Sequence, residues 1–297
     1  MNNGTVANNG RGQHVGGLQD AGEGRRALEG KTALVTGAAQ GVGKGIALEL
    51  GRAGCTVIVN FRSSPDLAEN TVQEINCLGS ESFAVQADIR SGDQVNKMFS
   101  EVQNKIPKLD ILVNNAGTQT WAPLLDLTES DWNRDLETNL RGSFLCTQAA
   151  ARWMKNAGGG SIINIGSGCN KVPFPRLVSY SVSKGGLDML TKVAAIELGM
   201  HGIRVNCIAP GAILIERTKQ ENPEYESVWG KQAPLGRVGL PEDVGHACVF
   251  LGSDAGSYVT GQTIWVDGGA FTQANWPYSL DDQAAVSMKH SVKLGQH

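Results

Sequence analysis

Residues 31–60 read KTALVTGAAQGVGKGIALELGRAGCTVIVN, and this stretch decides the fold. An apolar run at 32–35 is followed by a glycine-rich turn and then by an apolar-periodic segment at 46–53. A second apolar run at 56–60 completes the unit. Strand, turn, helix and strand within about 30 residues are the pattern of a βαβ unit, which places two parallel strands in one sheet.

Three glycines, Gly37, Gly41 and Gly43, punctuate the turn between the first strand and the first helix. They remove side chains where the backbone approaches a pyrophosphate and where the helix packs on the sheet, and the helix N-terminus offers unpaired N–H donors. The turn therefore predicts a dinucleotide phosphate site. A merely tight turn is the alternative, and it explains one glycine more readily than three.

The same alternation continues to about residue 277. Further strands are predicted at 82–86, 111–114, 162–165, 204–208 and 263–266, and helices at 65–78, 91–106, 128–153, 180–200 and 241–251, with Ser91 as an N-cap. Alternating strands and helices predict an α/β fold, a Rossmann-type doubly wound parallel sheet in a single domain at 31–277. Residues 1–30 and 278–297 lack periodicity and are predicted to be tails, the first either flexible or ordered on a partner subunit.

The end of the second strand carries no acidic residue. A dinucleotide site usually has an acid there to bind a ribose 2′-OH, whereas this chain reads Asn60-Phe61-Arg62-Ser63. The Arg62 guanidinium suits a 2′-phosphate through charge-assisted hydrogen bonds. The sequence therefore favours NADP over NAD as cofactor, with a solvated loop charge as the alternative interpretation of Arg62.

A second stretch that could carry catalytic residues runs from Ser167 to Lys184. Tyr180 and Lys184 are four residues apart and open an apolar-periodic segment, so they share one face of a helix. An ammonium beside a phenol favours the phenolate and allows proton exchange near neutral pH. Ser167, at a strand end, is placed to hold a substrate oxygen. Taken alone, such a tyrosine and lysine are more often a surface pair over their own helical turn.

Composition argues against several other functions. The formal charge of −3 in 297 residues and the lack of a basic run argue against a nucleic-acid partner. The longest apolar runs are strand-sized, well below the roughly 20 residues that cross a bilayer, so no membrane partner is expected. Six scattered cysteines without a CxxC motif or a histidine-rich partner set predict reduced thiols, no metal site and a cytoplasmic protein.

Together, these motifs resemble the short-chain dehydrogenase/reductase family. The resemblance is carried by the turn at 36–43, Asp88, the Asn114-Asn115-Ala116-Gly117 run, Asn139, Ser167, Tyr180-x-x-x-Lys184 and Pro210-Gly211. Ser167 precedes Tyr180 by 13 positions, the family's usual interval. Residues 60–64 and 257–261 look most like the branch of glucose 1-dehydrogenases and 3-oxoacyl-carrier-protein reductases.

The resemblance implies a role for each matching residue. Tyr180 would be the general acid in reduction and the base in oxidation, Lys184 would bind the nicotinamide ribose and lower the tyrosine pKa, and Ser167 would bind the carbonyl oxygen. Asn139 would kink its helix and hold a water of the proton relay. With Tyr180 and Lys184, the implied cofactor-binding residues are Gly37, Gln40, Gly41, Val42, Gly43, Arg62, Asp88, Ile89, Asn115, Ala116, Gly117, Pro210, Gly211 and Ile213, the last through its backbone N–H.

Two positions depart from the family pattern. Ile215 stands where many relatives have a threonine that contacts the cofactor, and Thr218 is the candidate to replace it. Gln40 stands where NADP-specific members often carry a basic residue, so the use of NAD beside NADP stays open.

The sequence says least about the residues that bind the substrate. Residues 212–234 lack strand periodicity and are predicted to form a mobile flap over the nicotinamide, with a plain surface excursion as the alternative. Side chains expected at the pocket are Trp121, Cys169, Asn170, Phe174 and Arg176, with Phe271, Trp276 and Tyr278 either closing it or packing between subunits. A sugar or another small polar alcohol or ketone is the favoured substrate. Reduction of a 3-oxoacyl thioester and a catalytically silent dinucleotide sensor are the alternatives.

By the same resemblance, the protein is expected to be a homo-oligomer, a tetramer or a dimer, built on the helices at 128–153 and 180–200. A substrate linked to a carrier protein would need a basic docking patch beside the flap, and Lys231 and Arg237 are the basic residues found near there.

Overall fold

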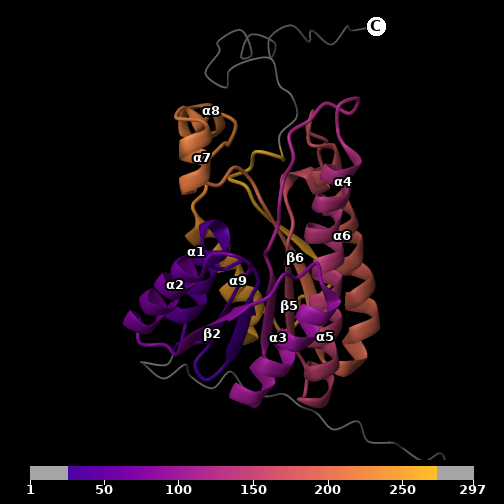
Figure 1. Ribbon diagram of the computed structural model, residues 1–297. Helices are drawn as coiled ribbons and strands as arrows, with labels where there is room; N and C mark the ends of the chain where they lie inside the picture. Colours follow the sequence, from indigo (N-terminus) through magenta and orange to yellow (C-terminus); the bar gives the residue numbers. More distant parts are fainter. Residues whose placement is uncertain (1–25, 273–297) are drawn as a thin grey trace, which may run out of the picture.

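The computed structural model describes residues 26–272, with a seven-stranded sheet at its centre (Figure 1). The strands are β1 (Thr32–Val35), β2 (Thr56–Phe61), β3 (Ser82–Gln86), β4 (Ile111–Asn114), β5 (Gly160–Ile165), β6 (Ile203–Pro210) and β7 (Thr263–Val266). Their order is β3-β2-β1-β4-β5-β6-β7, and every neighbouring pair is parallel. The chain winds outward from β1 on one side and from β4 on the other, which confirms the predicted doubly wound fold.

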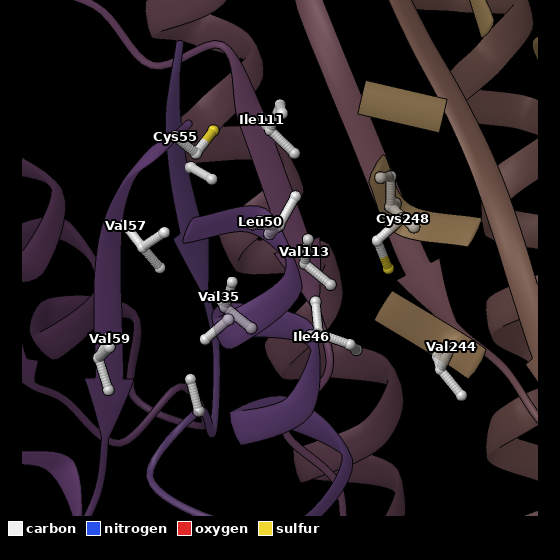
Figure 2. Packing of buried hydrophobic residues seen from close by; sticks show 14 of the residues in the cluster. Val35, Ile46, Leu50, Cys55, Val57, Val59, Ile111, Val113, Val244 and Cys248 are labelled. Atoms are coloured by element: carbon white, nitrogen blue, oxygen red, sulfur yellow. The ribbon is translucent and has the colours of Figure 1, made fainter. Parts of the chain in front are cut away.

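Helices cover both faces of the sheet. α1 (Gly41–Arg52), α2 (Pro65–Cys77) and α9 (Pro241–Gly252) pack on one face, and α3 (Gly92–Lys105), α5 (Ser143–Asn156) and α6 (Val178–Leu198) pack on the other (Figure 1). Because successive side chains of a strand point to opposite faces, one strand contributes to both cores: Val35 to the first and Leu34 to the second. Figure 2 shows the first core, where Ile46 of α1 lies among strand residues such as Val113.

Most predicted elements are confirmed within a few residues. The strands at 82–86, 111–114 and 263–266 have the predicted bounds, and the Ser91 hydroxyl caps α3 by accepting from the Gln94 N–H. α1 begins at Gly41 rather than at residue 46, because its first turns are rich in glycine and show no apolar periodicity. Local composition therefore located the elements better than it located their ends.

The helix predicted at 128–153 is interrupted in its middle. α4 (Glu129–Leu136) passes into α5 through a π-helical stretch, Glu137–Gly142. Asn139 lies inside this stretch and is fully buried. The widened turn is the helix distortion that the resemblance implied at Asn139, and such π-bulges are frequent at functional sites.

The packed domain begins before the predicted boundary at residue 31. Residues 26–30 form a turn in which Leu28 is fully buried and its N–H donates to the Ala53 carbonyl. A single leucine among polar neighbours has no periodicity, so the sequence pattern did not reveal this contact. The rest of the predicted N-terminal tail and the tail at 278–297 lie outside the described residues. No helix within 26–272 is both long and apolar enough to span a membrane.

The segment at 212–234 contains two short helices that the sequence reading did not predict. α7 (Glu216–Glu221) and α8 (Tyr225–Gly230) stand beyond the carboxyl ends of the strands (Figure 1). Each has six residues, which is too short for an apolar repeat to appear. The structure therefore places two short helices in the segment predicted to be a mobile flap, and its mobility stays a prediction.

Candidate active site

A cleft of about 570 Å³ lies at the carboxyl ends of the strands. It extends from the turn between β1 and α1 to the first turns of α6. Every predicted cofactor-binding residue contributes to its wall, and so do the predicted catalytic residues Ser167, Tyr180 and Lys184. Asn139, the remaining predicted site residue, is fully buried behind that wall.

The glycine turn leaves room for backbone alone. Gly37 has a φ of +63°, and a Cβ there would lie 2.9 Å from the Cα of Ala116. A Cβ on Gly43 would lie 2.3 Å from Nδ2 of Asn115 and 2.4 Å from the Gly37 carbonyl oxygen. Gln40, the N-cap of α1, makes no side-chain cap hydrogen bond, so the helix N-terminus faces the cleft without a side-chain acceptor. This cradle fits a dinucleotide pyrophosphate, whose oxygens accept from such N–H groups.

The loop after β4 is fastened to the glycine turn. The Thr36 hydroxyl accepts from the N–H groups of Asn115 and Ala116, both at 3.0 Å. Nδ2 of Asn115 in turn donates to the Thr36 carbonyl at 2.9 Å. The predicted run Asn115-Ala116-Gly117 thus forms a rigid floor beside the phosphate turn.

The ends of β2 and β3 form the part of the cleft farthest along the sheet from α6. Arg62 follows β2, and its backbone carbonyl accepts from Nε2 of Gln86 at 2.9 Å. Asp88 pairs with Arg90 at 2.6 Å, and the hydrogen bonds from Arg90 hold the pKa of the Asp88 carboxyl below its usual range. Asp88 is therefore an anchored carboxylate beside a cation, Arg62, whose charge also lowers its pKa.

The structure brings the three predicted catalytic side chains together. Tyr180 lies in the first turn of α6 and makes a side-chain hydrogen bond with Ser167, which follows β5. Lys184, one turn later, is buried, and its Nζ lies 5.6 Å from the centroid of the Tyr180 ring. The same Nζ donates to the Ile165 carbonyl at 2.6 Å. Ser167 is held in place because its Oγ accepts from the Cys169 N–H and its own N–H donates to Oδ1 of Asn170.

The pKa values of this group differ from the sequence prediction. Burial raises the pKa of Tyr180 to about 12, opposed by the hydrogen bond with Ser167 and the positive charge of Arg217. Burial also lowers the pKa of Lys184 to about 8. The net shift of the phenol pKa is therefore upward, opposite to the lowering predicted from a neighbouring ammonium, because burial outweighs the opposing contributions.

Asn139 supports the site from behind. Its Nδ2 donates to the Thr118 carbonyl and to the Ser183 hydroxyl, both at 2.9 Å, and its Oδ1 accepts from the Thr118 N–H at 2.8 Å. The Ser183 hydroxyl donates to the Tyr180 carbonyl at 2.7 Å. Asn139 thus connects the loop after β4 to the turn of α6 that carries Tyr180. The sequence reading missed Ser183, although its place next to Lys184 was a usable signal.

The two short helices add residues to the cleft wall, of which Arg217 and Tyr225 were not predicted as site residues. Arg217 and Thr218 of α7 and Tyr225 of α8 line it. The Thr218 hydroxyl, predicted to replace a cofactor contact, bonds both the N–H and the carbonyl of Ile215 at 2.9 Å and caps α7. Burial raises the pKa of the Tyr225 phenol, and a hydrogen bond from the Ile213 backbone opposes this shift. The Ile213 backbone that was expected to face the nicotinamide therefore lies beside the Tyr225 phenol.

The residues expected at the substrate end lie around the cleft rather than in its wall. Cys169 and Asn170 turn back to hold Ser167, while Trp121 is 56% exposed. Phe174 packs against Trp229 and Phe271, with ring centroids 6.3 Å and 5.6 Å apart. Arg176 is exposed, and Trp276 and Tyr278 lie outside the described residues.

Known proteins resemble this chain over most of its length. Residues 37–271 match a family model described as enoyl-(acyl carrier protein) reductase. A 3-oxoacyl-[acyl-carrier-protein] reductase of Staphylococcus epidermidis is 41% identical over 241 residues, which cover 81% of this chain and 99% of that protein. A 3β-hydroxysteroid dehydrogenase of Eggerthella lenta is 40% identical over 245 residues, covering 82% and 94%.

Solved structures agree with these sequence matches. A short-chain type dehydrogenase/reductase from Mycobacterium marinum aligns with a TM-score of 0.78 at 37% identity, covering 83% of this chain and 97% of that one. A gluconate 5-dehydrogenase from Burkholderia cenocepacia, in complex with NADP and tartrate, aligns with a TM-score of 0.79 at 34% identity, covering 84% and 98%. Fold, cleft and sequence all lead to one assignment: the chain belongs to the short-chain dehydrogenase/reductase family of oxidoreductases.

Proposed function

We propose that this protein is an NADP-dependent carbonyl reductase or alcohol dehydrogenase that acts on a sugar or another small polar substrate. The observation that carries the proposal is one cleft with a glycine cradle at one end and Ser167, Tyr180 and Lys184 at the other. A nicotinamide cofactor bound there supplies or takes up the hydride, and the protein must position it and move the proton.

The residues that would hold the cofactor follow the length of the cleft. The N-terminus of α1 with Gly37, Gly41 and Gly43 would bind the pyrophosphate, and Arg62 would bind a 2′-phosphate. Asp88, Ile89 and the floor at 115–117 would enclose the adenosine, and Pro210, Gly211 and Ile213 would face the nicotinamide. The NADP complex of the gluconate 5-dehydrogenase supports NADP, while Gln40 leaves NAD as a second cofactor.

Tyr180 would donate the proton to the substrate oxygen during reduction. With a pKa raised to about 12 by burial, its phenol is protonated at neutral pH and has a proton to give. Ser167, hydrogen-bonded to that phenol, would hold the same substrate oxygen as negative charge develops on it. Lys184 would bind the cofactor ribose, and Asn139 would keep the first turns of α6 in place and hold a relay water.

Reduction of a 3-oxoacyl thioester is the second candidate, and the 41% identity to a 3-oxoacyl-[acyl-carrier-protein] reductase favours it. The surface near the cleft argues for a small free substrate instead. Around α7 and α8, acidic residues outnumber the basic ones: Glu216, Glu221, Glu224 and Glu226 against Arg217, Lys219 and Lys231. Arg237 is already paired with Asp243 at 2.7 Å. An acidic carrier protein would gain little attraction from such a surface.

A substrate panel tests the proposal. Sugars, polyols, small ketones and 3-oxoacyl thioesters are each offered with NADPH or NADP, and the reduced nicotinamide is followed by absorbance. We expect turnover of a small polar substrate, and a loss of about 10²- to 10⁴-fold in kcat for Tyr180→Phe with cofactor binding retained. Turnover of thioesters alone would favour the second candidate, and full activity of Tyr180→Phe would refute the proton-transfer role.

We also propose that the protein is a homo-oligomer, with a second copy covering the outer faces of α5 and α6. These faces and the turn that follows α6 expose a row of apolar side chains: Phe144, Val182, Met189, Val193, Ile196 and Met200. Ile196 is 82% exposed, and residues 182, 189, 193, 196 and 200 recur at helical spacing, so they form one apolar stripe. Light scattering after gel filtration should give a dimer or tetramer that Ile196→Glu dissociates; a wild-type monomer would refute the proposal.

A further inference from the structure

The cleft wall is strongly unbalanced in charge. Four cationic side chains line it: Arg62, Arg134, Lys184 and Arg217. Among the described residues of the wall, Asp88 is the only acidic one, and its carboxylate is paired with Arg90 at 2.6 Å. A concave site lined by one sign of charge concentrates ligands of the opposite sign. The cleft is therefore built for anions along its whole length.

Three of the four cationic side chains already have a proposed ligand or a hydrogen-bond partner. Arg62 lies at the end of β2, where the proposed function places a 2′-phosphate. Arg134 pairs with Asp131 at 2.7 Å and donates to the Thr120 hydroxyl at 2.7 Å. Lys184 donates to the Ile165 carbonyl. Arg217 differs from these three, because its ion pair with Glu221 is long, at 3.7 Å, and the two side chains are 56% and 58% exposed.

Arg217 lies at the catalytic end of the cleft. Its positive charge acts on both phenols there, lowering the pKa of Tyr180 and that of Tyr225 against the effect of burial. Beside Tyr225, outside the cleft wall, lies an aromatic cluster, because Tyr225 packs on Trp229 at 6.2 Å and Trp229 on Phe174 at 6.3 Å between ring centroids. A guanidinium near a proton-donating phenol and an aromatic cluster is placed to bind a charged group of the substrate. The start of α7 also reaches the glycine turn, because a Cβ on Gly41 would lie 3.5 Å from Cδ1 of Ile215, so binding of a cofactor phosphate has to be tested beside it.

We propose that Arg217 binds a carboxylate of the substrate and that the substrate class of this site is small hydroxy acids and the matching oxo acids. A guanidinium offers a carboxylate two parallel charge-assisted hydrogen bonds, and the weak pair with Glu221 is readily exchanged for a bound anion. This proposal rests on the proposed function and narrows it from small polar substrates to acidic ones.

The redox step balances within this assignment. In reduction, the carbonyl carbon of the oxo acid accepts a hydride from NADPH, and its oxygen accepts the proton of the Tyr180 phenol, which is then restored from solvent. The products are the hydroxy acid and NADP. The carboxylate keeps its charge throughout, so Arg217 binds substrate and product alike and acts in selection rather than in proton transfer.

A cofactor phosphate offers the same chemistry to a guanidinium as a carboxylate does, so the experiment separates these two sources. It uses the full chain and three variants. Arg217→Met removes the charge, Arg217→Lys keeps the charge but lacks the two parallel N–H donors of a guanidinium, and Lys219→Met is the matched control. Lys219 lies on the same helix but is exposed and not part of the cleft wall. Binding of lactate, tartrate and gluconate to the NADP-saturated protein is measured by calorimetry, and binding of NADP to the protein alone is measured separately.

We expect Arg217→Met to weaken binding of the tightest of these hydroxy acids by about 10- to 100-fold, Arg217→Lys by less, and Lys219→Met to leave it unchanged. The affinity for NADP should stay the same in all three variants. The proposal is overturned if the wild type binds none of the three acids, or if Arg217→Met binds them as the wild type does. Weaker NADP binding in Arg217→Met would assign Arg217 to a cofactor phosphate and also overturn it.

A kinetic comparison separates this proposal from the function on which it rests. The ratio of kcat/KM for gluconate to that for its uncharged amide should favour the acid in the wild type and fall by about 10-fold or more in Arg217→Met. Turnover confined to uncharged substrates would overturn the carboxylate proposal and keep the oxidoreductase. If no substrate of the panel is turned over, the proposed function fails, while the binding measurement still reports on Arg217 because it needs no turnover.

Discussion

The Ser179 hydroxyl donates a 2.6 Å hydrogen bond to Oδ2 of Asp135, and both residues are fully buried. The same oxygen accepts from the Thr120 N–H at 3.0 Å, whereas Oδ1 has no hydrogen-bond partner among the described residues. Because Ser179 precedes Tyr180, a buried carboxylate on α4 fixes the start of the helix that carries the proposed acid. It also places a negative charge that raises the pKa of Tyr180.

Asp135→Asn should lower the pKa of Tyr180 while preserving the fold. The amide oxygen can still accept from Ser179 and Thr120, but the negative charge that disfavours the phenolate is gone. We expect the phenol to titrate at a lower pH in an ultraviolet difference titration referenced to Tyr180→Phe, and the alkaline limb of kcat to move in the same direction. Asp126→Asn, an exposed change of equal charge, should leave both unchanged. A shift to higher pH would contradict the assignment.

Tyr225→Phe should tighten cofactor binding. The Tyr225 phenol takes a hydrogen bond from the Ile213 backbone, the group proposed to face the nicotinamide. Removing this competitor frees the N–H at the cost of one neutral hydrogen bond, so we expect the Kd for NADP to fall by about 2- to 10-fold. Calorimetric titration measures it. An unchanged or larger Kd would mean that the cofactor and Tyr225 do not compete for the Ile213 N–H.

Arg62→Asp should reverse the preference between cofactors. The new carboxylate would repel a 2′-phosphate and stand near Asp88, and it would offer an acceptor for a ribose hydroxyl of NAD. We expect the KM for NADP to rise by about 10- to 100-fold with little loss for NAD. Arg62→Lys keeps the charge and should keep most of the preference. An unchanged KM for NADP in Arg62→Asp would remove Arg62 from the cofactor site.

Gly43→Ala should damage both stability and cofactor binding. Its Cβ would lie 2.3 Å from Nδ2 of Asn115, the atom that donates to the Thr36 carbonyl, so the floor of the cleft must shift. We expect a loss of about 1–3 kcal/mol in the free energy of unfolding and no measurable binding of NADP. Thermal unfolding and titration measure the two effects.

Gly185→Ala is the control for that substitution. Gly185 lies in α6, and a Cβ there meets nothing within 4 Å. Alanine is the better helix former, so this variant should gain about 0.5–1 kcal/mol in stability. A Gly43→Ala protein as stable as Gly185→Ala would mean that the glycine turn is looser than the structure indicates.

Much of the fold could be predicted from local sequence. Strands such as 111–114 are short apolar runs whose burial on both faces follows from composition alone, and their alternation with helices leaves a parallel sheet as the economical arrangement. The phosphate turn was equally local, because Gly37, Gly41 and Gly43 meet a backbone requirement within a few residues. The shared helix face of Tyr180 and Lys184 follows from their spacing.

The electrostatics of the site could not be predicted in this way. Spacing indicated that Lys184 would lower the pKa of Tyr180, but burial raises it, and the charges that modulate it come from Arg217 and Asp135 on other elements. A pKa depends on how much solvent a group loses and on every charge nearby in space, and neither quantity is encoded in neighbouring residues.

The sequence by itself determined the βαβ start, the order of strands and helices along the chain, and the glycines of the phosphate turn, because each depends on residues close together in the chain. It predicted the Ser167, Tyr180 and Lys184 group from spacing and family resemblance, and the fold brings Ser167, after β5, next to Tyr180 of α6. Tertiary structure alone decided that Arg217 of α7 and Tyr225 of α8 line the cleft, and that Asp135 accepts a hydrogen bond from Ser179, next to Tyr180. Those positions result from the packing of segments far apart in the chain, where no local pattern reports which side chains will meet.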